Sequence, residues 1–170
     1  ISADGTIKID SAVLPKRNMA LFGLACELEG RFDTMAWYGK GPHETYWDRK
    51  TGAMVGNYSK KASEMVTDYV RPQENGNRCD IRYMDIVNDT GVGMHISASD
   101  LMQASLLLNT TKEYEKATHL HKLPQKDTVA LNIRAHQIGV GGDIPGIAQL
   151  LKKYTLPKNK VYKLSISISK

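Results

Sequence analysis

The sequence predicts an all-β fold, an antiparallel sandwich or barrel of many short strands. Apolar residues recur mainly with a period of two, the period of a strand with one buried face. Clusters of Gly, Pro, Asn and Asp, typical of turns, separate the alternating segments. The chain has 170 residues, 41% of them hydrophobic and 24% charged, which fits one globular domain with a sizeable core. This composition excludes a disordered chain, a collagen and a disulfide-stapled miniprotein.

The alternation is clearest at the two ends of the chain. Ile7 and Ile9 alternate with polar neighbours, and the apolar residues of 162–168 alternate with a lysine and serines. Between them, 79–83 alternates apolar with charged residues, which predicts another half-buried strand. Further strands are expected at 20–29, 34–39, 64–70, 92–98, 103–109 and 129–138.

One short helix is expected near 111–119. Thr110 and Glu113 have the spacing of a capping box, in which each side chain binds a free amide of the first turn. No internal repeat or linker divides the chain, so residues 1–170 are treated as a single domain. No apolar run approaches the roughly 18 residues that a membrane span needs.

Charge and cysteine content point to no special partner. The net charge is +5, and the basic residues of 152–163 are better explained as a solvated face than as a phosphate-binding surface. Nucleic acid is therefore not favoured. Cys26 and Cys79 are too few and too far apart for a metal site, so no metal is expected. Both are predicted to be buried free thiols, with a disulfide left open for an oxidising compartment.

The segment 37–49 is the densest in functional groups. Its glycines and proline set a tight loop, and its aromatic and charged side chains are the kinds that bind the C–H faces and hydroxyls of sugars. A well-packed structural turn is the alternative. The candidate substrate-site residues here are Gly41, His43, Glu44, Tyr46, Trp47, Asp48 and Arg49.

Two further loops stand out. Residues 71–78 contain Asn75-Gly76, a strong turn signal, and are interpreted as a structural turn; Glu74 and Arg78 could form a local ion pair or contact a ligand. The turn residues are Pro72, Glu74, Asn75, Gly76 and Arg78. Residues 139–143 are rich in glycine but lack the Lys-Ser/Thr of a phosphate loop, so a close backbone approach is favoured.

The histidines give no catalytic signature. His119 and His121 lack an evident third metal ligand, and His119 is expected at a helix end. His95 and His136 fall inside strand patterns and are expected in the core or its wall. No nucleophile elbow occurs, and the sequence alone cannot place carboxylates such as Glu44 and Glu74 across a glycosidic bond.

Taken together, the three loops resemble one family. The patterns Trp-Tyr-Gly-x-Gly-Pro-x-Glu-x-Tyr-x-Asp-Arg at 37–49, Asp-Tyr-Val-x-Pro-Gln-Glu-Asn-Gly-x-Arg at 68–78 and Gln-x-Gly-Val-Gly-Gly-Asp at 137–143 occur in this order. They are similar to the C-terminal small-chain domain of family-two glycoside hydrolases of the β-galactosidase type. The resemblance covers the chain from about Leu14 to its end.

The resemblance implies a supersandwich, a large antiparallel β-sandwich like the galactose-mutarotase fold, that packs on a catalytic barrel. That barrel carries both catalytic glutamates, so we expect no catalytic residue in this chain and no hydrolase activity from it alone. It implies that 41–49 lies near the active-site mouth and can move on ligand binding. His43 stands where some members have Gln. The parent enzyme would cleave a terminal β-galactoside with retention, and any divalent or monovalent cation would be bound outside this chain.

The chain departs from the family at one sugar-binding position. The resemblance implies that 141–143 opens a segment that reaches into the active site, so Asp143 and Gly146 are further substrate-site candidates. Family members carry a Trp, a galactose platform, three residues after the position of Asp143. Here Gly146 occupies that place, and a glycine cannot stack on a sugar. Trp47 is a candidate replacement, or else the substrate differs.

The length also departs from the family. The family domain has further strands before this region, and the chain starts at Ile1, so we expect a sandwich truncated at its N-terminal side. Such a cut exposes strand edges, which predicts self-association. A stand-alone carbohydrate-binding or mutarotase-like protein, with His43, His136 and Glu44 as available groups, stays open, as does a purely structural interaction domain. A bacterial cytoplasm and a periplasm both stay open as compartments.

Overall fold

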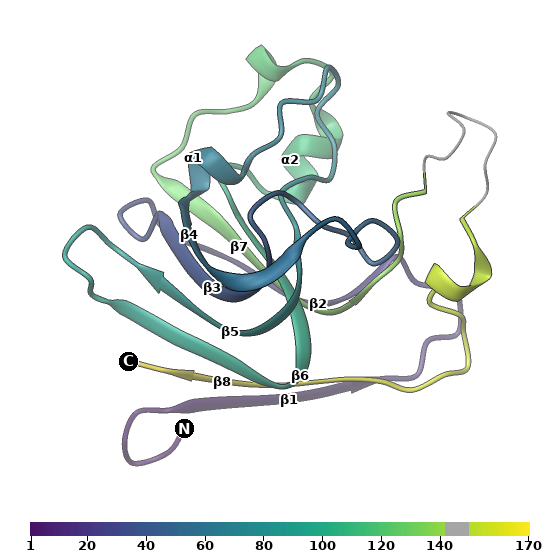
Figure 1. The fold of residues 1–170 in the computed structure, drawn as a ribbon, viewed down its shortest axis with the longest axis horizontal. Coiled ribbons are helices and arrows are strands. Elements are labelled where there is room, and N and C mark those ends of the chain that lie inside the picture. Colours follow the sequence, from purple (N-terminus) through teal and green to yellow (C-terminus); the bar gives the residue numbers. More distant parts are fainter. Residues whose placement is uncertain (142–149) are drawn as a thin grey trace.

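The computed structural model describes residues 1–141 and 150–170. The described chain is an all-β fold whose regular structure is mainly antiparallel strand (Figure 1). The strands are β1 (Ile7–Val13), β2 (Leu21–Glu29), β3 (Thr34–Gly41), β4 (Met54–Lys61), β5 (Arg78–Val87), β6 (Gly93–Leu107), β7 (Thr128–Gln137) and β8 (Tyr162–Ser169). The helices are α1 (Ala62–Met65) and α2 (Thr111–Lys116), with 3₁₀ turns at Leu120–Lys122 and Lys152–Tyr154.

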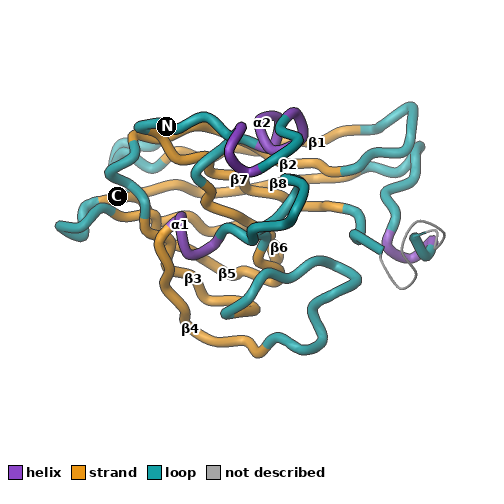
Figure 2. The backbone as a smooth tube through the Cα atoms, turned by 90° about the horizontal axis from the view of Figure 1, so that it is seen from above, coloured by secondary structure: helices purple, strands orange, loops and turns teal. Residues whose placement is uncertain are grey.

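Strand β6 connects the two layers of the fold. One run of paired strands has the order β1-β8-β6-β5-β3-β4, and β7 pairs with both β6 and β2. The N-terminal part of β6, 95–98, pairs with β8, whereas 103–107 pairs with β7. Because one strand serves both runs, the sheet folds over onto itself (Figure 2). This arrangement confirms the predicted all-β sandwich.

The core lies between the two layers and follows from the period-two pattern. In β3 every second side chain is buried, including Met35 and Trp37. These pack with the apolar faces of β5 to β8, and Met65 of α1 and Tyr114 of α2 close the core. Burying such side chains contributes roughly 1.5–3 kcal/mol each, as an upper estimate. The apolar residues of the alternating sequence pattern are therefore the residues that form the core.

The strand predictions differ from the structure in three places. Residues 64–70 were predicted as a strand, but α1 occupies 62–65 and the rest is loop, with Val70 94% exposed. Of the apolar residues there, Met65 ends α1 and is buried in the core, and Val66 packs against the core from the following loop. Strand β4 was not predicted, because it is an edge strand with a mostly exposed, polar alternation. Residues 92–98 and 103–109 belong to one bent strand, β6, and were predicted as two.

The helix prediction was correct in place and cause, but α2 is shorter than 111–119. The Thr110 side chain accepts a hydrogen bond from the Glu113 amide, and Glu113 accepts one from the Thr110 amide. The capping box is therefore present. His119 does not end α2; it precedes a 3₁₀ turn and stacks on His121.

The cysteine prediction was half right. Cys79 is buried, but Cys26 is exposed because β2 is an edge strand. Neither forms a disulfide. His95, expected in the core or wall, lies on the partly exposed face of β6 beside Asp85. Among residues 1–141 and 150–170, no three His, Cys, Asp or Glu side chains gather as a metal site, and no helix is long and apolar enough to cross a membrane.

Candidate functional site

The loops at 42–49 and 74–78 join through one carboxylate. Glu44 accepts hydrogen bonds from the hydroxyls of Thr67 and Tyr69 and from the Gly76 amide at 2.9 Å, and it pairs with Arg49. Burial raises the pKa of Glu44, but these donors outweigh burial and hold the pKa below its ordinary value. Glu44 therefore acts as an ionised anchor.

Gly76 has to be a glycine at this anchor. Its φ is +70°, and a Cβ there would lie 2.8 Å from the Met65 carbonyl oxygen. Only glycine adopts this left-handed backbone freely while allowing so close an approach. The turn predicted from Asn75-Gly76 is thus part of the contact between the two loops.

A second set of contacts joins the same loops deeper in the fold. The Asn77 Nδ2 donates to the Thr45 carbonyl at 2.9 Å, and the Thr45 amide donates to the Asn77 carbonyl at 2.7 Å. The Arg78 guanidinium, 2% exposed, donates to the carbonyls of Pro42 and Gly76. Burial lowers the pKa of Arg78 to about 10, so it remains cationic at neutral pH.

Glu74 forms a long-range ion pair and not a local one with Arg78. Arg134 of β7 donates to both carboxylate oxygens of Glu74, at 2.6 and 3.0 Å. The Arg134 side chain is 2% exposed and the Glu74 side chain 24%. The Tyr46 hydroxyl also donates to Glu74, and burial raises the pKa of Tyr46, so it stays protonated. We call the contacts of Glu44, Glu74, Asn77, Arg78 and Arg134 the loop junction.

Asp48 binds the glycine-rich segment at 139–141 to the loop at 42–49. Its carboxylate accepts hydrogen bonds from the amides of Val140 and Gly141, at 3.0 and 2.7 Å. A side chain at Gly139 would collide with the Asp48 carboxyl group. The predicted close backbone approach is thus a contact with the 42–49 loop, and the three sequence motifs meet at one end of the fold.

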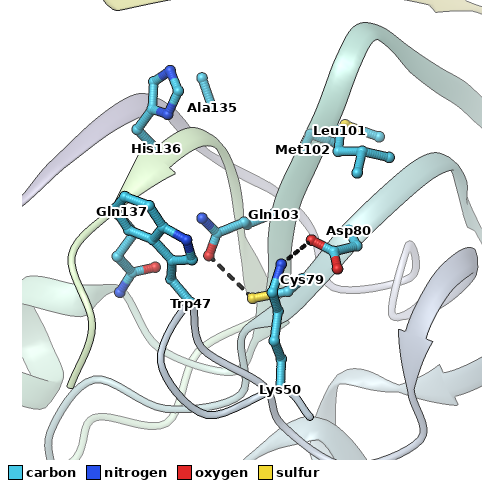
Figure 3. A pocket seen from close by; sticks show the side chains of 10 residues that line it. All are labelled: Trp47, Lys50, Cys79, Asp80, Leu101, Met102, Gln103, Ala135, His136 and Gln137. Atoms are coloured by element: carbon cyan, nitrogen blue, oxygen red, sulfur yellow. Dashed lines mark hydrogen bonds and ion pairs between the residues drawn. The ribbon is translucent and has the colours of Figure 1, made fainter. Parts of the chain in front are cut away.

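A pocket of about 220 Å³ opens beside the loop junction (Figure 3). Its polar lining includes Trp47, Lys50, Asp80, Gln103, His136 and Gln137. Trp47 packs edge-on against Tyr154, with ring centroids 5.7 Å apart. The Lys50 ammonium pairs with Asp80 at 2.6 Å. Aromatic, amide and charged groups therefore face one cavity of single-ring size.

Comparison with known sequences identifies the family of the chain. A family model described as "Beta galactosidase small chain" matches residues 1–168. The chain belongs to the β-galactosidase small-chain family. The β-galactosidase of Priestia megaterium is 39% identical over 162 residues, covering 94% of this chain, and that of Halalkalibacterium halodurans is 30% identical over 160 residues, covering 90%. The chain spans only 16% of the length of either relative.

Within this small-chain fold, the predicted site residues divide into two groups. Glu44 and Tyr46 turn inward to the junction, and Asp48 binds the backbone of the third motif. Gly41 is buried beside the Trp37 and Tyr58 rings. His43 and Arg49 are exposed, and Trp47 lines the pocket. The turn residues Pro72, Asn75, Gly76 and Arg78 are buried, and Glu74 is partly buried. Asp143 and Gly146 lie outside the described residues.

The sequence analysis missed several groups of the small-chain pocket. Lys50 and Asp80 are 30 positions apart and neither belongs to a predicted site, although Lys50 directly follows the first motif. Gln103 lies inside a segment predicted simply as strand. Trp47 was a candidate from the first motif, Gln137 opens the third motif and His136 was a predicted wall residue; all three line the cavity.

Proposed function

We propose that the chain is the C-terminal accessory domain of a β-galactosidase-like glycoside hydrolase, where it packs on the catalytic barrel and helps to wall the sugar-binding site. The observation that carries this is the meeting of the three family motifs beside an open pocket with Trp47 in its wall. The parent reaction would be hydrolysis of a terminal β-galactoside with retention, through a covalent glycosyl intermediate on barrel glutamates.

The site residues support a positioning role more than catalysis. A mutarotase-like reaction needs an acid and a base that are free to exchange protons with the sugar. Glu44 is instead held ionised by several donors. His43 is exposed, and His136 lies in the pocket wall. The described residues therefore favour an accessory domain over a stand-alone mutarotase.

A domain exchange tests this proposal. The segment of the Priestia megaterium β-galactosidase that matches this chain is replaced by residues 1–170, and turnover of a chromogenic β-galactoside is measured. We expect the exchanged enzyme to be active, and both the truncated enzyme and the isolated chain to be inactive. Turnover by the isolated chain, or an inactive but folded exchange, would overturn the proposal.

The role of Trp47 as an aromatic platform is tested in the same exchanged enzyme. Trp47→Ala should raise KM for the galactoside by roughly 10- to 100-fold, since it removes an aromatic face from the sugar. Tyr83→Ala is the matched control, because Tyr83 is an exposed aromatic of β5 that is absent from the pocket lining. An unchanged KM in Trp47→Ala contradicts the platform role.

A further inference from the structure

The amide of Gln103 is held in one orientation by the loop junction. The Thr45 carbonyl can only accept, so the Asn77 side-chain nitrogen must be the group that faces it, at 2.9 Å. That nitrogen also lies 2.9 Å from the Gln103 Oε1, which must therefore accept. The Gln103 Nε2 therefore points away from Asn77 and from Cys79, as Figure 3 shows for Cys79. Within 1–141 and 150–170 it has no hydrogen-bond partner.

Gln137 is oriented by the same logic. A guanidinium can only donate, and Arg134 Nη1 donates to the Gln137 Oε1 at 2.7 Å. The Gln137 Nε2 must then face away from Arg134, and the described chain supplies it with no acceptor. Two amide groups of the pocket wall are thus anchored through their oxygens and keep their N–H donors for another molecule.

Asp80 adds a fixed acceptor. It sits where the β5–β6 register shifts, between Arg78 and Ile81, and its φ is +54°, in the left-handed region. Few residues other than glycine adopt this backbone, although Asp and Asn do so most readily. The shift turns the Asp80 carboxylate toward Lys50 at the pocket, where both side chains remain partly exposed, 20% and 29%.

The pocket is balanced in charge and of single-ring size. Lys50 and Asp80 offset each other. Burial, together with the Lys160 charge, lowers the pKa of His136, so its ring is neutral at neutral pH. The cavity of about 220 Å³ is smaller than the roughly 300–1,000 Å³ of drug-sized sites. Fixed donors, one carboxylate and an indole suit a neutral ring that carries several hydroxyls.

We propose that this pocket binds one neutral monosaccharide ring, with the Gln103 and Gln137 amides donating to its hydroxyls, Asp80 accepting from them and Trp47 lying against its C–H surface. The inference deepens the proposed function and rests on it for the choice of a sugar. The arrangement of donors and acceptor comes from the chain's own contacts. Lys50 acts as a positioning residue that holds Asp80.

Nuclear magnetic resonance of the ¹⁵N-labelled 170-residue chain tests the proposal, with methyl β-galactoside as the probe. The two indole N–H signals report separately, because Trp37 is 2% exposed and donates to the Lys40 carbonyl, whereas Trp47 lines the pocket. We expect a saturable shift of the Trp47 signal and none of the Trp37 signal. No shift at Trp47, or one produced by inorganic phosphate and not by the galactoside, would overturn the proposal.

Asp80→Asn tests the acceptor, because Asn keeps the shape and tolerates the left-handed backbone. We expect it to weaken galactoside binding about 10- to 100-fold, as for hydrogen bonds to a charged group. Asp85→Asn is the matched control, since Asp85 pairs with His95 and is absent from the pocket lining, and it should bind like the parent chain. Equal weakening in both variants, or in neither, contradicts the proposal. If the Trp37 signal of Asp80→Asn shows that this variant is unfolded, Gln103→Leu is used instead. We expect Gln103→Leu to weaken galactoside binding to the same extent.

The two proposals can fail separately. An active exchanged enzyme with no galactoside-dependent Trp47 shift overturns the pocket alone. An inactive but folded exchanged enzyme whose isolated chain shows the shift overturns the accessory-domain proposal and leaves the pocket as a sugar site.

Discussion

The loop junction and the pocket lie on either side of Cys79, and both are rich in polar side chains. In the junction the charged groups have partners within the chain: Glu44 accepts from four donors, and Arg134 donates to both oxygens of Glu74. Arg78 donates to backbone carbonyls. In the pocket, Gln103 and Gln137 use their oxygens inward and keep their nitrogens free within the described chain. The comparison teaches that largely satisfied polar groups build the wall, although the buried Asn77 Oδ1 lacks a partner among the described residues. Half-committed groups mark the surface that we propose meets a ligand.

The largest difference between the two regions is expected on breaking the Glu74–Arg134 pair. Glu74→Ala leaves the Arg134 charge buried without its partner, which should cost about 3–5 kcal/mol in the free energy of unfolding, measured by urea denaturation. Glu29→Ala is the control, because its pair with Arg31 is largely exposed and contributes about 0–1 kcal/mol. A cost below about 1 kcal/mol for Glu74→Ala would show that the junction is not held by this pair.

Glu44→Gln should cost about 1–3 kcal/mol, because it weakens the hydrogen bonds of a half-buried acceptor. The cost should depend on pH. The pKa of Glu44 is lowered in the folded chain, so its stabilisation is complete above the ordinary value of 4.5 and is lost as pH falls through the lowered pKa.

Denaturation of parent and variant at pH 7 and at about pH 3 measures this dependence on pH. Their stabilities should converge at the lower pH. Curves that stay parallel would mean that Glu44 is not ionised in the junction.

Cys79 should report opening of the junction. It is 1% exposed, and burial raises its pKa to about 11, so a thiol reagent should modify it slowly in a Cys26→Ser background. Glu44→Gln should speed this modification about tenfold, as expected for a loss of about 1.4 kcal/mol in local stability. In denaturant both proteins should react equally fast. An unchanged native rate would place Cys79 outside the opening unit.

The smallest effect is expected in the pocket itself. Lys50→Met should change the free energy of unfolding by less than about 1 kcal/mol, because the Lys50–Asp80 pair is partly exposed. Urea denaturation beside Glu74→Ala measures the contrast. A cost of several kcal/mol would assign this pair to the structural wall and remove the distinction between the two regions.

Most strands could be predicted from the sequence because one face of each is buried. β3 and β8 show this directly, since their buried residues alternate with exposed or half-buried ones. β4 escaped prediction because an edge strand buries little, so its pattern is weak. The helix α2 was predicted because a capping box is local.

The site was less predictable because its decisive contacts are long-range. The motif loops were found by their composition, and the family resemblance joined them. The partner of Glu74, Arg134, lies 60 residues away, and the Lys50–Asp80 pair spans 30. No spacing rule connects such positions, since the register shift in β5 that turns Asp80 exists only in the folded sheet.

The pairing of β1 with β8 bears on how the chain is made. Ile7 lies opposite Ile168 in this pair, and β8 stands between β1 and β6 in its sheet. β1 is translated before β8, so its pairing within the described chain waits for β8 to follow. At roughly 5–20 residues per second that wait lasts roughly 8–30 s. Among the described strands, β1 therefore completes its pairing only after β8 has been made.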